Sequence, residues 1–72
     1  MSVEIHPSAI VEKGAELADR VKIGAFCYIG SEVQLGAGTE VHHHASIEGN
    51  TSLGEACEVF PYAYLGWKTQ DL

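Results

Sequence analysis

The chain has 72 residues and a formal net charge of −6, and this length allows one domain at most. Nucleic acids and anionic membranes bind basic patches, and the four basic residues form none, so neither is an expected partner. No stretch is long and apolar enough to span a membrane, and the N-terminus lacks a signal-peptide pattern, which predicts a cytoplasmic protein without membrane insertion.

Large aliphatic side chains recur at every sixth position along almost the whole chain. The series is Ile5, Val11, Leu17, Ile23, Ile29, Leu35, Val41, Ile47, Leu53, Val59 and Leu65. On an α-helix a step of six residues turns by about 600°, so these side chains would form no stripe. A hexapeptide period is instead typical of a parallel β-helix, in which three short strands and three corners make one coil. The pattern therefore predicts an all-β fold of under four coils.

A small or β-branched residue follows each aliphatic residue by four positions. These residues are Ala9, Ala15, Val21, Cys27, Val33, Thr39, Ala45, Thr51, Cys57, Ala63 and Thr69. Because side chains alternate along a strand, each of them should point inward together with the next aliphatic residue, and the aliphatic residues should stack in three columns about 4.8 Å apart. The two cysteines fall on different faces, so we expect them to be buried and unpaired.

The two residues after each outward position should form a corner. Candidate corners are Pro7-Ser8, Lys13-Gly14, Ala37-Gly38, Gly49-Asn50 and Pro61-Tyr62. A type II turn favours Pro first and a residue that tolerates positive φ second, and Gly14, Gly38 and Asn50 occupy that second position. Arg20, Phe26 and Tyr62 fit it less well, so we expect more than one type of corner.

Three consecutive histidines, His42, His43 and His44, are the most conspicuous candidates for chemistry. Zinc accepts imidazole and carboxylate ligands. However, His42 should point outward from a face while His43 and His44 form the next corner, so the three side chains should diverge. We therefore expect surface or subunit-contact histidines, with no metal and no cofactor. A metal site shared between subunits, as in the hexapeptide-repeat carbonic anhydrases, stays open.

Two other outward groups are predicted to be non-catalytic. Glu12 and Glu48 share one outward position two coils apart, separated by Gly30, and form a solvated column rather than a catalytic pair. Aromatic residues concentrate near the end of the chain, which is typical of a subunit interface. These are Phe60, Tyr62, Tyr64 and Trp67. The spacing offers no nucleophile–base pair, phosphate-binding loop or cysteine–metal motif.

Four segments resemble one known family. They are IHPSAIVEKGAEL, VKIGAFCYIGSEVQLGAGT, IEGNTSLGEACEVFPYAYLG and the closing QDL. Together they cover essentially the whole chain and are similar to the amino-terminal coils of the UDP-N-acetylglucosamine acyltransferases of lipid A biosynthesis. The hexads are shared by many acyl- and acetyltransferases, whereas FPYAYLG followed by QDL is more specific to this family.

The resemblance implies a left-handed β-helix that assembles as a homotrimer. It also implies the first step of lipid A biosynthesis, in which a 3-hydroxyacyl group moves from acyl carrier protein to the glucosamine 3-hydroxyl of UDP-N-acetylglucosamine. A histidine of a later coil acts as the general base, so no catalytic residue is expected in this chain. Gln70, Asp71 and Leu72 match the substrate-binding QDL element, in which the first two positions contact the sugar nucleotide.

Residues 1–72 are accordingly expected to be a single β-helix segment that lacks the later coils, the catalytic histidine and the helical carboxyl-terminal domain of that family. Such a fragment should be inactive by itself. Two alternatives stay open. The chain could be a stand-alone β-helix module for structure or oligomerisation, or a piece of another hexapeptide transferase or of a carbonic anhydrase. Bound zinc would favour the carbonic anhydrase.

Overall fold

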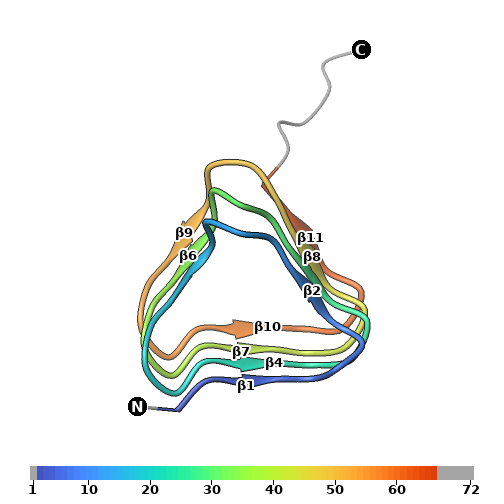
Figure 1. Cartoon of the computed structure of the whole chain (residues 1–72), viewed down its shortest axis with the longest axis horizontal. Coiled ribbons are helices and arrows are strands. Elements are labelled where there is room, and N and C mark those ends of the chain that lie inside the picture. The colour runs from blue at the N-terminus through green and yellow to red at the C-terminus, as the bar shows by residue number, and fades with distance from the viewer. Residues whose placement is uncertain (1, 67–72) are drawn as a thin grey trace.

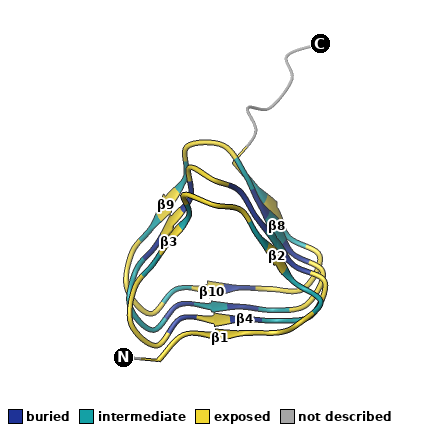
Figure 2. Cartoon of the chain, in the orientation of Figure 1, coloured by how far each residue is buried: buried dark blue, intermediate teal, exposed yellow. Residues whose placement is uncertain are grey.

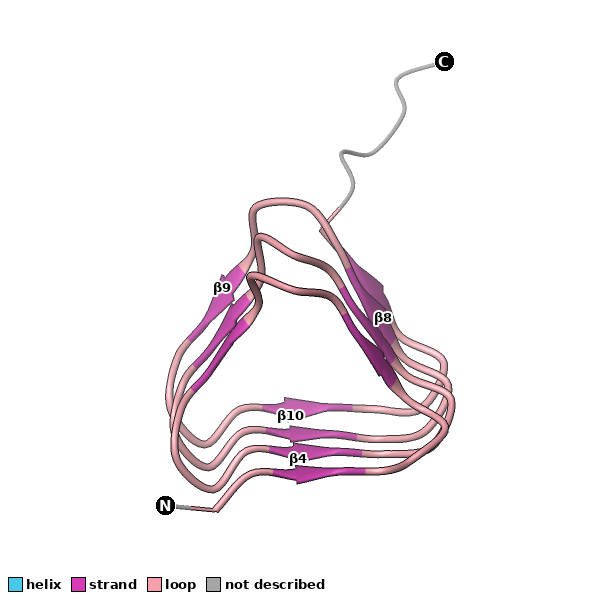
Figure 3. Cartoon of the chain, in the orientation of Figure 1, coloured by secondary structure: helices cyan, strands magenta, loops and turns pink. Residues whose placement is uncertain are grey.

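The computed structural model describes residues 2–66, which wind into a triangular tube of short strands joined by corners (Figure 1). No helix occurs among these residues (Figure 3), and none is therefore available to cross a membrane. The strands are β1 (Glu4–Ile5), β2 (Ile10–Val11), β3 (Glu16–Leu17), β4 (Lys22–Ile23), β5 (Tyr28–Ile29), β6 (Gln34–Leu35), β7 (Glu40–Val41), β8 (Ser46–Ile47), β9 (Ser52–Leu53), β10 (Glu58–Val59) and β11 (Tyr64–Leu65).

Each strand pairs in parallel with the equivalent strand of the next coil, and this pairing builds three sheets. The first face is β1-β4-β7-β10, the second is β2-β5-β8-β11 and the third is β3-β6-β9. The coils wind in the left-handed sense, although parallel crossover connections otherwise strongly prefer the right-handed one. The predicted all-β, left-handed parallel β-helix of under four coils is therefore confirmed.

The register places the aliphatic residues in the three predicted columns. The first contains Ile5, Ile23, Val41 and Val59, the second contains Val11, Ile29, Ile47 and Leu65, and the third contains Leu17, Leu35 and Leu53. The middle of each column is the most buried part (Figure 2): Ile29 and Ile47 have no exposed surface, whereas Ile5 is 44% exposed. An end position is more exposed because a coil covers it on one side only.

The smaller inward residues fill the remaining space beside these columns. Val21, Val33 and Ala45 are fully buried. Thr39 is also buried, and its hydroxyl donates a hydrogen bond of 3.0 Å to the Gly54 carbonyl oxygen, so no polar group is left unsatisfied there. Both cysteines are unpaired, as predicted, but only Cys27 is buried, and the expectation of a buried Cys57 is wrong because that thiol is half-buried.

Apart from the corner at residues 49–50, the predicted corners form where expected, but their conformations agree only in part. Positive φ occurs at Gly14 and Gly38, as expected. It also occurs at Arg20, Phe26 and Tyr62, with φ of 62°, 59° and 66°, so the expectation that these residues fit the second corner position less well is wrong.

The corner at residues 49–50 corrects a second expectation. Positive φ falls on Gly49, at 71°, and not on Asn50. Glycine adopts this conformation without a steric penalty, so the turn forms one residue earlier. Thr51 stabilises the shifted turn, since its amide donates to the Gly49 carbonyl oxygen at 3.0 Å and its hydroxyl to that of Glu48 at 2.8 Å.

Candidate functional site

The residues predicted to bind substrate, Gln70, Asp71 and Leu72, lie outside the described residues, as does Trp67. Their role therefore remains a prediction. The described surface carries other polar and aromatic groups that could bind a ligand or a partner. They lie on the first face, on the second face and at the corner between these two faces.

The corner between the first and second faces carries stacked rings, termed here the aromatic corner: Phe26, His43, His44 and Tyr62. The Phe26 and His44 ring centroids lie 5.1 Å apart, and those of His44 and Tyr62 lie 4.9 Å apart with 14° between the ring planes. These separations suit stacked aromatic pairs. The stack follows the coil axis because the same corner position recurs in each coil.

The aromatic corner exposes a large apolar surface. Phe26 is 63% exposed and Tyr62 is 72% exposed, and Phe60 and Tyr64 nearby are also exposed. The predicted concentration of outward aromatic residues is thus confirmed for Phe60, Tyr62 and Tyr64. Their role as a subunit interface remains a prediction.

The three consecutive histidines do not converge on one point. His42 belongs to the first face, and its Nε2 lies 2.8 Å from Oε2 of Glu58. His43 and His44 turn toward each other, with their Nδ1 atoms 2.9 Å apart. The predicted divergence is therefore confirmed for His42 and wrong for His43 and His44, because the tight corner brings these neighbouring side chains together.

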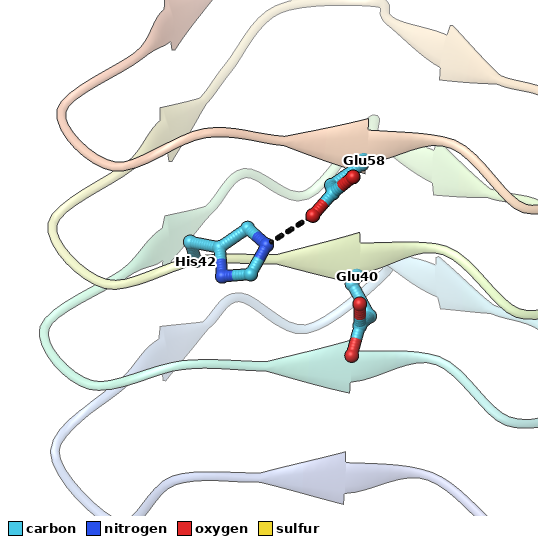
Figure 4. Close-up of side chains that lie close together, drawn as sticks. All are labelled: Glu40, His42 and Glu58. Atoms are coloured by element: carbon cyan, nitrogen blue, oxygen red, sulfur yellow. Dashed lines mark hydrogen bonds and ion pairs between the residues drawn. The ribbon is translucent and has the colours of Figure 1, made fainter.

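The first face carries a cluster of two carboxylates and one imidazole, formed by Glu40, His42 and Glu58 (Figure 4). Glu40 and Glu58 are register partners on β7 and β10, and His42 directly follows β7. One ligand atom from each side chain lies within 4.8 Å of the others. Zinc accepts both carboxylate oxygen and imidazole nitrogen, and among residues 2–66 this cluster is the one group of three or more such side chains close enough together to hold a metal ion.

This cluster was not predicted, because it combines equivalent positions of successive coils, which lie apart in the sequence. Glu40 and Glu58 occupy the same position one coil apart, and His42 lies two residues further on the same outward side. Residues related by this repeat become neighbours in a β-helix. A search for ligand residues at that separation would have found the cluster.

The second face carries a tyrosine between two carboxylates. A hydrogen bond with the Glu12 side chain, together with partial desolvation and the charges of Glu12 and Glu48, raises the pKa of the Tyr28 hydroxyl above its ordinary value. Glu12 and Glu48 are separated by Gly30 in the column, as predicted. The arrangement offers one hydroxyl donor to Glu12, with the charge of Glu48 nearby, and not a pair of carboxylates that share a proton.

One serine–histidine contact was not predicted. The Ser8 hydroxyl oxygen lies 2.8 Å from Nδ1 of His6 and accepts a hydrogen bond of 3.0 Å from the Phe26 amide. No residue of the described range orients the other imidazole nitrogen, as a catalytic arrangement would require. The contact ties the first corner to the equivalent corner one coil later, and we assign it this structural role.

The repeat, the three columns and the left-handed coil define a hexapeptide-repeat β-helix protein. No family model matches the chain. The chain is 42% identical over 69 residues to the acyl-[acyl-carrier-protein]–UDP-N-acetylglucosamine O-acyltransferase of Thermodesulfovibrio yellowstonii, covering 96% of this chain and 27% of that protein. For the enzyme of the same name from Mesorhizobium japonicum the identity is 39% over 71 residues, with 99% and 25% covered.

The structural comparison agrees with the sequence comparison. The UDP-N-acetylglucosamine acyltransferase from Campylobacter jejuni superposes with a TM-score of 0.91 at 38% identity, over 96% of this chain and 27% of that chain. A coil of opposite hand could not superpose so closely, so the handedness agrees as well. The chain is therefore a relative of the UDP-N-acetylglucosamine acyltransferases, and it spans about a quarter of their length.

Proposed function

We propose that this chain forms amino-terminal coils of an enzyme that transfers an acyl group from acyl carrier protein to UDP-N-acetylglucosamine. The observation that carries the proposal is the match of nearly the whole chain, in both sequence and fold, to enzymes named for this reaction. A 3-hydroxyacyl group and the glucosamine 3-hydroxyl are the proposed reaction partners, in the first step of lipid A biosynthesis. The proposed location is cytoplasmic.

The chain's own part in this reaction is structural and substrate-binding. Its hexads supply a rigid β-helix that can be continued by further coils, because the strands of each coil pair only with adjacent coils. Gln70, Asp71 and Leu72 are proposed to bind the sugar nucleotide. The general base is proposed to lie on a coil that this chain does not contain, so residues 1–72 alone should transfer no acyl group.

A chimera tests the proposal directly. Residues 1–72 would replace the matching amino-terminal segment of the Campylobacter jejuni enzyme, and acyl transfer from acyl carrier protein to UDP-N-acetylglucosamine would be measured. We expect an active chimera and no turnover by residues 1–72 alone. A chimera that folds and assembles like the parent enzyme but shows no activity would contradict the proposal, as would turnover by the isolated chain.

The substrate-binding assignment has its own test in the same chimera. Asp71→Ala should lower kcat/KM about tenfold or more, because a lost hydrogen bond between a carboxylate and a sugar hydroxyl costs ~1.4 kcal/mol or more. In the isolated chain, millimolar UDP-N-acetylglucosamine should leave the amide resonances unmoved, because the later coils proposed to complete the site are not part of residues 1–72. An unchanged kcat/KM in the variant chimera would refute the assignment of the QDL element without refuting the enzyme class.

A second candidate function is a stand-alone oligomerisation module. The exposed rings of the aromatic corner favour it, because contiguous exposed apolar surface commonly marks an interface. This candidate predicts assembly without any contribution to acyl transfer. An inactive but correctly assembled chimera would therefore favour it over the enzyme.

A further inference from the structure

Glu40 and Glu58 place two negative charges side by side on the first face. They are direct register partners, and paired strands lie about 4.8 Å apart. Like charges directly opposite each other destabilise a sheet. Lys22 flanks Glu40 on its other side and is itself the register partner of Glu4. Among residues 2–66, however, the Glu40 carboxylate makes no hydrogen bond or ion pair. A cation between Glu40 and Glu58 would relieve this repulsion.

The His42 imidazole is held in a position that suits such a cation. Its ring lies nearly parallel to that of Phe60, with 13° between the planes and 6.3 Å between the centroids. Its Nε2 points at the Glu58 carboxylate, 2.8 Å away (Figure 4). The His42 amide donates a hydrogen bond of 2.9 Å to the Val59 carbonyl oxygen, which fixes the backbone beside β10. The three side chains thus project from two coils whose backbones are paired to each other.

We propose that Glu40, His42 and Glu58 form a zinc-binding site that links adjacent coils of the β-helix. Two carboxylate oxygens and one neutral imidazole nitrogen supply three ligands, and water completes the coordination shell. Mg²⁺ and Ca²⁺ prefer all-oxygen sites, so the imidazole favours zinc over both. Zinc would replace the present His42–Glu58 hydrogen bond and recruit the unpaired Glu40 carboxylate. The site is independent of the proposed acyl transfer, and because its three ligands come from one chain it differs from the metal site shared between subunits that the carbonic anhydrase alternative would require.

The neighbouring corner offers a competing zinc site, and the test must separate the two. His43 and His44 bring their Nδ1 atoms within 2.9 Å of each other. His43→Gln therefore serves as the matched control for His42→Gln. Glu48→Gln serves as the control for Glu40→Gln and Glu58→Gln, because Glu48 is an outward carboxylate of the second face that lies outside the cluster.

Calorimetric titration of the 72-residue chain with zinc chloride at pH 7.5 tests the site. We expect one zinc ion per chain, and affinity lowered about tenfold or more by His42→Gln, Glu40→Gln or Glu58→Gln. Even removing a residue that only hydrogen-bonds to a metal ligand typically lowers metal affinity by this much, so removing a ligand itself should do at least as much. His43→Gln and Glu48→Gln should change the affinity by less than about threefold, a small effect in free energy. Circular dichroism confirms that each variant is folded.

Thermal unfolding provides a second readout that does not depend on heat of binding. Zinc should raise the Tm of the parent chain, because it binds the folded state, and should raise the Tm of Glu58→Gln less at the same zinc concentration. Absence of saturable binding at about 1 mM zinc would overturn the site, since this corresponds to a very weak interaction. Equal weakening in all five variants, or weakening by His43→Gln alone, would overturn it as well, because the ion would then bind non-specifically or at the corner.

Discussion

Ile29 lies in the middle of the second column, between Val11 and Ile47, and has no exposed surface. Ile29→Asp would bury an unpaired charge, and we expect it to lower the free energy of unfolding by about 4 kcal/mol or more. Glu32→Lys alters an exposed corner and should change it by about 0.5 kcal/mol or less. Urea denaturation measures both values. Equal effects would show that the assigned register is wrong.

Replacing Ala56 with glycine tests the conformation of a corner. Its φ of 55° is in the left-handed region, which costs an L-residue about 1 kcal/mol relative to glycine. Ala56→Gly should therefore raise the free energy of unfolding by up to about 1 kcal/mol. Ala37 occupies the first position of the equivalent corner without positive φ, so Ala37→Gly should lower it by about 0.4–1 kcal/mol. Chemical denaturation should show opposite signs, and a common sign would contradict the assigned corner geometry.

At the scale of elements, adjacent coils approach each other closely beside the third face. A methyl group added at Gly36, after β6, would lie 2.6 Å from the backbone carbonyl atoms of Gly54, whereas one added at Gly54 would meet no atom within 4 Å. Gly36→Ala would push the two coils apart and should lower the free energy of unfolding by about 1–3 kcal/mol. Gly54→Ala should change stability by about 0.5 kcal/mol or less. A Tm comparison of the two variants checks this, and equal Tm values would argue against close packing of these coils.

The contact between Tyr28 on β5 and Glu12, which directly follows β2, makes the stability of the fold depend on pH. Because the folded state raises the pKa of Tyr28, its contribution to stability is present below the unfolded tyrosine pKa of about 10 and is lost as pH rises through the higher folded value. The free energy of unfolding should therefore fall more steeply above about pH 10 in the parent chain than in Tyr28→Phe. Denaturation at pH 9–11 measures both slopes. Identical slopes would contradict the contact.

At the scale of the whole molecule, the aromatic corner should drive self-association, and a homotrimer is the expected species. Tyr62→Asn removes an exposed ring while retaining a residue that tolerates positive φ, so it should weaken assembly without disturbing the corner. Glu32→Gln, at a corner outside the aromatic corner, should leave assembly unchanged. Light scattering at high micromolar concentration measures the mass of each. A monomeric parent chain would contradict the prediction.

The sequence by itself determined the β-helix, the three columns and the inward cysteines. This was possible because each depends on a period and on strict alternation along a strand, and no contact between distant residues has to be known. Ile29 and Ile47 could be placed in one column by counting hexads alone. The resemblance of the four segments likewise identified the relatives that the comparisons show.

Only the tertiary structure decided which side chains meet across coils and which residue of a corner adopts positive φ. Glu40, His42 and Glu58 converge because side-chain rotamers direct outward groups of two coils toward each other, and a repeat specifies the position of a side chain but not its rotamer. Gly49 takes the left-handed conformation in place of Asn50 because two adjacent residues both tolerate it and local hydrogen bonds select one. Such choices depend on small energy differences between neighbours that a hexapeptide pattern does not contain.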